Sequence, residues 1–304
     1  MELQKRTLKD WVIATRPWSA PASVIPVLFS LAYLFFISHQ EGLEVNWLNA
    51  WLCLPMLVIL HFGGNLVSDY YDNINKVDIP GSLNGVRSME SGKFKPKEIL
   101  FYGYALLGIG AIIGLFIVWN SSVEVLWIGA LALILPLGYP WLKAHALGDL
   151  DILLCFALLP SIGVAFVATE AYHPELLLYC LPYGLLTVAI LHANNTRDIR
   201  NDHRAGLETF PRLTGGKAAQ YVYTAELTLP YVMLVVFAVC GWLPMWLLIG
   251  FLTLPIAVKN IRTMLKARPE EELDIATLDQ ATAQLQLPFG LLYALSLVIA
   301  ELFI

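Results

Sequence analysis

The chain has 304 residues, of which 58% are hydrophobic and 14% are charged, and its mean hydropathy is +0.64. Soluble domains carry about a quarter charged residues, so this composition excludes an ordinary soluble protein and indicates a membrane protein. The net charge of −5 gives no reason to expect nucleic acid as a partner.

Apolar stretches long enough to cross a hydrocarbon core of roughly 30 Å recur along the whole sequence. They predict an all-α, multi-pass membrane protein with about nine transmembrane helices around a central cavity. The expected spans are residues 18–38, 48–68, 99–119, 123–140, 150–169, 175–195, 219–240, 243–258 and 283–303. We expect residues 1–304 to form one membrane domain in contact with the lipid bilayer, and no obligate protein partner is evident.

The distribution of basic residues tests these spans, because Lys and Arg gather in cytoplasmic loops. With a cytoplasmic N-terminus, all 19 Lys and Arg residues fall on the cytoplasmic side. The opposite loops, around residues 39–46, 120–123, 170–175 and 241–243, contain acids and histidines but neither Lys nor Arg. The sequence therefore predicts an N-terminus in the cytoplasm.

Similar acidic motifs close the second and the sixth predicted spans. The first runs Asn65-Leu-Val-Ser-Asp69-Tyr-Tyr-Asp72, and the second runs Asn194-Asn-Thr-Arg-Asp198-Ile-Arg-Asn-Asp202. Residues three or four apart share one face of a helix, so the polar side chains of each motif can converge. Carboxylate and amide oxygens suit Mg²⁺, which keeps part of its coordination shell for water and phosphate. The two motifs predict a cytoplasmic trap for Mg²⁺ and a diphosphate.

The two motifs lie four predicted helices apart and in parallel orientation. This spacing indicates two four-helix pseudo-repeats followed by a final helix, with the active site between the halves. The longest cytoplasmic loops, residues 73–97 and 197–217, follow the motifs and are candidates for a cap over the site.

A prenyl diphosphate matches both properties of such a protein. Mg²⁺ and basic side chains can bind its polyanionic head, and a helical tunnel facing lipid can accept its hydrocarbon tail. Neutralising the leaving diphosphate promotes ionisation of the allylic carbon–oxygen bond, and the resulting carbocation can alkylate an electron-rich aromatic ring. Basic partners on the cytoplasmic side include Arg16, Arg87 and Lys143.

The two acidic motifs, together with Tyr139-x-x-x-Lys143 on about nine helices, resemble the UbiA superfamily of intramembrane aromatic prenyltransferases over nearly the whole chain. Residues 16–23, 64–72, 146–150 and 192–198 resemble most the branch that prenylates 1,4-dihydroxy-2-naphthoate in menaquinone synthesis. The Tyr139-Pro140 step departs from that branch and also resembles the 4-hydroxybenzoate branch, so the acceptor stays open between the two.

The resemblance implies a role for each matching position. The Mg²⁺ ligands would be Asn65, Asp69, Asp72, Asp198 and Asp202, assisted by Asn194 or Asn195. Tyr139 and Lys143, together with Arg197, would contact the diphosphate or stabilise charge near the cleaved bond. The aromatic acceptor would lie near Asn65, Arg16 or Asp149, and Asp149 would orient a hydroxyl group or help to remove a proton.

Structural interpretations compete with these assignments. A single Asp at a helix end is usually a cap, Arg87 and Lys143 can be topological anchors, and His61 and His192 are better explained as packed histidines than as ligands. Glu226, inside an apolar span, is left outside the predicted site. A transporter with repeated halves and a Mg²⁺-dependent phosphotransferase are the other functional classes. The short N-terminal segment favours a bacterial inner membrane.

Overall fold

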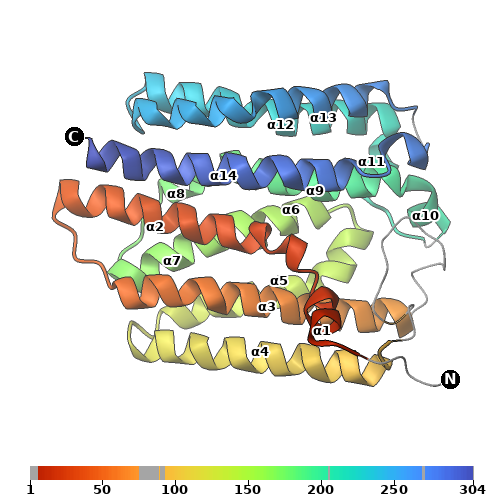
Figure 1. Ribbon diagram of the computed structural model, residues 1–304, viewed down its shortest axis with the longest axis horizontal. Coiled ribbons are helices and arrows are strands. Elements are labelled where there is room, and N and C mark those ends of the chain that lie inside the picture. The colour runs from red at the N-terminus through yellow and green to blue at the C-terminus, as the bar shows by residue number, and fades with distance from the viewer. Residues whose placement is uncertain (1–5, 75–88, 90–92, 205, 269–270, 304) are drawn as a thin grey trace.

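The computed structural model describes residues 6–74, 89, 93–204, 206–268 and 271–303. Its long helices run side by side along one axis (Figure 1), and one isolated bridge joins His145 and Glu208. The all-α prediction is therefore confirmed for the described part of the chain.

In order, the elements are α1 (Leu8–Ala14), η1 (Pro17–Ser19), α2 (Pro21–Glu41), α3 (Trp47–Ile74), α4 (Pro96–Trp119), α5 (Val125–Ala144), α6 (Gly148–Leu153), η2 (Leu154–Leu158), α7 (Leu159–Thr169), α8 (Leu176–Tyr179), α9 (Leu181–Arg197), α10 (Ile199–Arg204), α11 (Phe210–Thr214), α12 (Gly216–Val239), η3 (Met245–Thr253), α13 (Leu254–Lys266), η4 (Glu272–Ile275) and α14 (Leu278–Leu302).

Among the described residues, 7 helical segments are long and apolar enough to cross a membrane. They are Pro17–Glu41, Trp47–Tyr71, Pro96–Trp119, Gly148–Thr169, Gly216–Val239, Met245–Lys266 and Glu272–Leu302. The other two predicted spans, 123–140 and 175–195, are also helical. The first of them lies in α5, and the second is interrupted at Cys180, next to Leu181-Pro182, and so divides into α8 and the 17-residue α9. The nine predicted spans thus fall on helical segments, but only 7 segments in the described part of the chain are long and apolar enough to cross a membrane, so the count of nine crossings stays a prediction.

The segment from Gly148 to Thr169 changes its helical winding partway along. A π-helical turn, Leu154–Leu158, connects α6 to α7, and Pro160 lies just beyond it. Proline has no N–H to donate to the carbonyl four residues earlier, which accounts for the change in hydrogen-bond register at this point. The turn gives α6, which carries Asp149, a helical register different from that of α7.

The centre of the bundle is an aromatic cluster contributed by α2, α9 and α14. Phe29 stacks on Tyr293 with ring centroids 4.6 Å apart, and it contacts Tyr183 at 5.3 Å. All three side chains are fully buried. α14 approaches α2 so closely that a Cβ at Gly290 would lie 2.4 Å from Ile25. This cluster holds the helix that carries the second acidic motif against two other long helices.

The helix α3, which carries the first acidic motif, packs along α4 through glycines. A Cβ at Gly63 would lie 3.0 Å from the Gly103 carbonyl oxygen, and one at Gly103 would lie 3.1 Å from the Gly63 carbonyl oxygen. Small residues at such crossings let membrane helices approach each other without a clash. The close contact fixes the position of the end of α3.

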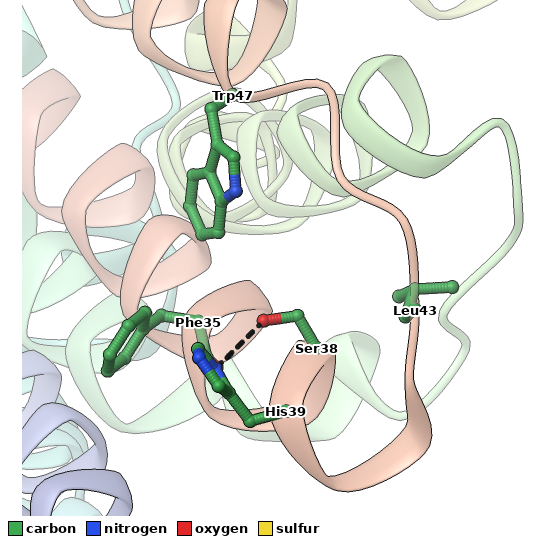
Figure 2. A pocket seen from close by; sticks show the side chains of 5 residues that line it. All are labelled: Phe35, Ser38, His39, Leu43 and Trp47. Carbon is green, nitrogen blue, oxygen red and sulfur yellow. Dashed lines mark hydrogen bonds between the residues drawn. The ribbon is translucent and has the colours of Figure 1, made fainter.

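The two acidic motifs lie at the same end of the bundle. In Figure 1 the end of α3 lies at the right-hand side with α1, α10 and α11. The opposite end has a pocket of about 350 Å³, lined by Phe35, Ser38, His39, Leu43 and Trp47 (Figure 2). That pocket lies on the connection between α2 and α3, away from both motifs. The predicted four-helix duplication and the cytoplasmic N-terminus stay predictions.

Candidate active site

The first acidic motif is attached to the turn that joins α1 to α2. The Asn65 side-chain nitrogen donates hydrogen bonds to the Thr15 carbonyl and to Ser19 Oγ, both at 3.1 Å. The Arg16 guanidinium forms an ion pair with the carboxylate of Asp69, whose side chain is 3% exposed against 31% for Arg16. A charged group is thus buried on α3 with its countercharge supplied from the N-terminal turn.

Arg16 reaches Asp69 because the backbone of this turn has an unusual conformation. Arg16 has φ 57° and ψ 59°, the left-handed region that non-glycine residues seldom occupy. Pro17 follows it and disfavours the right-handed helical region for the preceding residue. The Arg16 carbonyl accepts a hydrogen bond from Ser19 Oγ at 2.8 Å, which stabilises the turn. This strained turn therefore positions the Arg16 guanidinium.

His61 supports the same turn from one helical turn earlier on α3. Its ring nitrogens lie 2.7 Å from Ser23 Oγ and 3.3 Å from Ser19 Oγ. The residue is thus a packed, hydrogen-bonded histidine, which was the favoured interpretation of the sequence. Asp72 lies on α3 one turn beyond Asp69, but its side chain is outside the described part of the protein, and so is the whole of Arg87.

The second acidic motif begins where α9 ends. The Arg197 side chain donates to both oxygens of Asp198, at 2.9 and 3.0 Å. Its third nitrogen donates to Asp279 at 2.9 Å and to the Ala276 carbonyl at 3.3 Å. Arg197 is 2% exposed. The residue predicted to contact diphosphate is thus turned into the protein, where it connects the acidic motif to the start of α14.

Of the two adjacent asparagines, Asn194 contacts this carboxylate region and Asn195 is buried without a partner for its side-chain oxygen. With the Asn194 amide turned over, its nitrogen lies 3.1 Å from Asp198 Oδ2 and its oxygen lies 3.0 Å from Arg197 Nη2. Asn195 is 2% exposed, and its side-chain oxygen has no hydrogen-bond partner. A buried acceptor without a partner is costly, which indicates a position where a ligand supplies the missing contact.

Asp202 lies one helical turn after Asp198, on α10. It accepts a hydrogen bond from the Thr209 hydroxyl at 3.1 Å. Burial raises the pKa of this carboxyl above its usual value, while the positive charge of Lys143 opposes that rise. Lys143 lies in the last turn of α5, and the His145–Glu208 bridge joins the following loop to the segment after Asp202. The fold therefore brings Lys143 close to the second motif.

The remaining predicted positions lie on α5 and α6. Tyr139 is half-buried, one helical turn before Lys143. Asp149, in the first turn of α6, approaches His192 of α9, with 3.3 Å between Asp149 Oδ2 and His192 Nδ1.

The sequence did not reveal Asp279 as a partner of Arg197 or Thr209 as a partner of Asp202. His192 and Glu226 were noted in the sequence but left outside the site. The signal in the sequence that could have placed His192 and Glu226 together is that each is a titratable residue inside an apolar stretch.

The donor set around the two motifs fits Mg²⁺ chemically. Asp69, Asp198 and Asp202 are buried carboxylates, and the Asn195 side-chain oxygen lacks a partner. A carboxylate oxygen accepts more than one hydrogen bond or cation, so an arginine partner does not exhaust it. Hard oxygens of this kind are the ligands that Mg²⁺ takes in combination with water and phosphate.

Helices long enough to span a membrane, with clustered acids and arginines at one end, define a polytopic membrane protein whose polar site lies at one end of the bundle. The model of the UbiA prenyltransferase family matches residues 11–278. The chain therefore belongs to the UbiA prenyltransferase family and is an integral membrane protein.

Curated relatives agree with this assignment over almost the whole chain. The UbiA prenyltransferase domain-containing protein 1 of Danio rerio is 32% identical over 297 residues, covering 95% of this chain and 84% of that protein. Its Xenopus tropicalis counterpart is 30% identical over 302 residues and covers 97% of this chain and 84% of that protein. These relatives are animal proteins of the UbiA domain type. They neither single out the naphthoate branch nor support a bacterial inner membrane.

Solved structures show the same fold. A UbiA homolog from Aeropyrum pernix K1 matches with a TM-score of 0.67 and 17% identity, covering 91% of this chain and 98% of that one. A UbiA homolog from Archaeoglobus fulgidus bound to GPP and Mg²⁺ matches with a TM-score of 0.57 and 14% identity, covering 97% of this chain and 100% of that one. The resemblance to the UbiA superfamily is thereby confirmed at the level of family and fold.

Proposed function

We propose that this protein transfers a polyprenyl group from a prenyl diphosphate to 1,4-dihydroxy-2-naphthoate in a Mg²⁺-dependent reaction. The prenyl cation attacks the ring carbon that bears the carboxylate. The carboxylate then leaves that carbon as CO₂, whose bonding electron pair restores the aromatic ring, and the products are a demethylmenaquinol, CO₂ and diphosphate. The observation that carries the proposal is the pairing of a buried acid with an arginine in each motif, Arg16 with Asp69 and Arg197 with Asp198. 4-Hydroxybenzoate is the alternative acceptor.

The oxygen ligands for Mg²⁺ in this proposal are divided between two motifs. Asn65, Asp69 and Asp72 serve one ion, and Asp198 and Asp202 serve the other with help from Asn194 or Asn195. When bound, Mg²⁺ neutralises charge on the leaving diphosphate. Asn65 would offer its side-chain oxygen, because its nitrogen donates to Thr15 and Ser19.

The basic residues differ in what they can do. Arg16 is partly exposed and lies beside Asp69, so its guanidinium can turn to the diphosphate when a cation takes over the carboxylate. Lys143 contributes positive charge near Asp202, and Tyr139 precedes it by one turn on the same helix.

Arg197 forms ion pairs with Asp198 and Asp279 and so fixes the conformation of the second motif. Asp149 would contact the acceptor.

The proposal locates the reaction at the cytoplasmic surface of the membrane. The support is that both motifs lie at one end of the bundle and that all basic residues of the sequence fit the same side. Homologues that bind GPP or DMAPP with Mg²⁺ support the donor class. A bacterial inner membrane is the proposed location, and the animal relatives make a eukaryotic organelle membrane the competing one.

The deciding experiment offers the purified protein in nanodiscs a prenyl diphosphate and Mg²⁺, with 1,4-dihydroxy-2-naphthoate and 4-hydroxybenzoate in parallel. We expect prenylated naphthoquinol, abolished by EDTA and reduced about 100-fold or more by Asp198→Asn or Asp69→Asn. Asp274→Asn is the matched control, since Asp274 pairs with the exposed Arg268. If only 4-hydroxybenzoate is prenylated, the protein belongs functionally to the 4-hydroxybenzoate branch. A folded protein that prenylates neither acceptor contradicts the proposal.

A further inference from the structure

Three titratable side chains from three helices meet beside the second acidic motif, and the proposed reaction uses only one of them, Asp149. They are Asp149 of α6, His192 of α9 and Glu226 of α12, and one ligand atom from each lies within 4.8 Å of the others. His192 is fully buried, and Glu226 is 7% exposed. His192 Nδ1 lies 3.3 Å from Asp149 Oδ2 and 3.4 Å from Glu226 Oε1.

The histidine is oriented by its other nitrogen. His192 Nε2 lies 3.0 Å from the Ala219 carbonyl oxygen, which can only accept a hydrogen bond, so Nε2 carries the proton. When the imidazole is neutral, its lone pair is therefore on Nδ1, which lies 3.3 and 3.4 Å from the two carboxylates. Histidines that bind metal ions in proteins have this arrangement, with one nitrogen directed at the ion and the other N–H donated to a carbonyl or carboxylate.

Several atoms in this cluster lack the hydrogen bonds that burial demands. His192 Nδ1, Asp149 Oδ1 and Glu226 Oε2 are buried, and none has a hydrogen-bond partner of good geometry. Hydrogen bonds from an imidazolium to a carboxylate are about 2.7–2.9 Å long, so separations of 3.3 and 3.4 Å do not describe a proton shared between these groups. All three side chains point at one location without satisfying each other.

The two distances from His192 Nδ1 to the carboxylate oxygens match the edge of a tetrahedron around a metal ion. For Zn²⁺ with bonds of 2.0–2.1 Å to nitrogen and oxygen, tetrahedral geometry separates neighbouring ligand atoms by roughly 3.3–3.4 Å. An octahedral Mg²⁺ site with similar bond lengths separates them by about 2.9 Å. The observed distances of 3.3 and 3.4 Å therefore favour a tetrahedral ion over a second magnesium ion.

Charge balance leads to the same conclusion. With both carboxylates ionised and the imidazole neutral, as metal binding requires, the cluster carries two negative charges. Glu226 lies roughly 15 Å along α12 from Gly216, the first residue of that helix. Ionised groups at such depth are costly unless they are paired or coordinate a metal. A divalent cation neutralises the cluster, and three protein ligands leave a fourth position for water.

We propose that Asp149, His192 and Glu226 bind one Zn²⁺ ion, at a site separate from the Asn-x-x-x-Asp motifs. The ion would connect α6, α9 and α12 just before the second motif, since His192 precedes Asn195 by one helical turn on α9. The site does not depend on the identity of the aromatic acceptor.

The test measures zinc directly in the full-length protein in detergent. After treatment with a chelating resin and addition of one equivalent of ZnSO₄ with MgCl₂ in excess, we expect about one zinc ion per chain by mass spectrometry of the metal. Glu226→Gln and His192→Gln should lower zinc affinity by more than the roughly 10–100-fold seen when an outer-shell partner is lost. Glu124→Gln, which alters the exposed residue just before α5, is the matched control and should retain the ion.

X-ray absorption at the zinc edge gives a second, independent measurement on the unchanged protein. We expect only nitrogen and oxygen ligands at about 2.0–2.1 Å. Absence of zinc from the unchanged protein, equal zinc in Glu226→Gln and Glu124→Gln, or sulfur ligands from the cysteines would each overturn the proposal. The zinc measurements contain no prenyl substrate, so a protein without zinc would not contradict the proposed prenyl transfer. A protein that binds zinc but transfers no prenyl group would contradict only the proposed prenyl transfer.

Discussion

The guanidinium of Arg197 forms two parallel hydrogen bonds to the carboxylate of Asp198, 2.9 and 3.0 Å long. The same side chain also reaches Asp279, so one buried cation connects the second acidic motif to α14. Arg16 forms an ion pair with Asp69 in the first motif, although there the arginine stays partly exposed. The two motifs therefore resemble each other in sequence, but the arginine paired with the first is partly exposed and the arginine paired with the second is buried.

Replacing Arg197 should destabilise the whole protein. Arg197→Gln leaves the buried Asp198 and the partly exposed Asp279 without their countercharge, and losing one partner of a buried pair costs about 3–5 kcal/mol. Thermal unfolding in detergent, followed by tryptophan fluorescence, measures the effect. Arg268→Gln is the control, because Arg268 is 73% exposed and its pair with Asp274 is surrounded by water. Equal melting temperatures for the two variants would contradict the structural role of Arg197.

The N-terminal helix should show an acid-sensitive contact. The hydrogen bond from Lys93, 2.6 Å long, lowers the pKa of Asp10 to about 2, with further help from Thr7. Because the folded pKa lies below the ordinary value, the contact is fully present above about pH 4 and is lost as the pH falls toward 2.

Carboxyl ¹³C NMR of labelled protein in micelles measures this titration directly. In Lys93→Gln the midpoint for Asp10 should move up toward the ordinary value, because the main cause of the shift is gone. Lys97→Gln, which alters an exposed lysine of the same segment, should leave the midpoint near 2. An Asp10 midpoint that is the same in Lys93→Gln and in the unchanged protein would show that the Lys93–Asp10 pair does not form.

The crossing of α3 and α4 should tolerate no side chain at Gly103. A Cβ at this position would lie 2.9 Å from Val67 Cγ2 and 3.1 Å from the Gly63 carbonyl oxygen. Gly103→Val should therefore cost about 1–3 kcal/mol through overpacking. Gly108→Val on the same helix is the control, since a Cβ there meets nothing within 4 Å. Equal melting temperatures for the two variants would mean that the helices are farther apart than described.

The predicted topology can be tested with a membrane-impermeant maleimide. In a background with the native cysteines replaced, Ser122→Cys should react only from the side opposite the N-terminus, and Lys266→Cys only from the cytoplasmic side of oriented vesicles. The basis is that all basic residues fall on the predicted inner side. Labelling of both positions from the same side would refute nine crossings with a cytoplasmic N-terminus.

Features encoded over short distances could be predicted from the sequence. Helix positions follow from apolar runs, and the placement of Asn65 and Asp69 one turn apart on a single helix follows from their spacing. The partners of these residues could not be predicted in the same way, because they are distant in the chain. Arg197 and Asp279 are 82 residues apart, and Arg16 and Asp69 are 53 apart. The interruption of the helix at Cys180 also escaped prediction, since a proline two residues later is compatible with a span.

The Arg197–Asp279 pair also has a consequence for the order of synthesis. A ribosome adding about 5–20 residues per second needs roughly 4–16 s to proceed from one partner to the other. During that interval the second motif already exists, but the helix that completes it has not been made. Arg197 can therefore form this pair only after the start of the last long helix has been made. A chain halted before Asp279 would carry both acidic motifs without the ion pair that anchors the second.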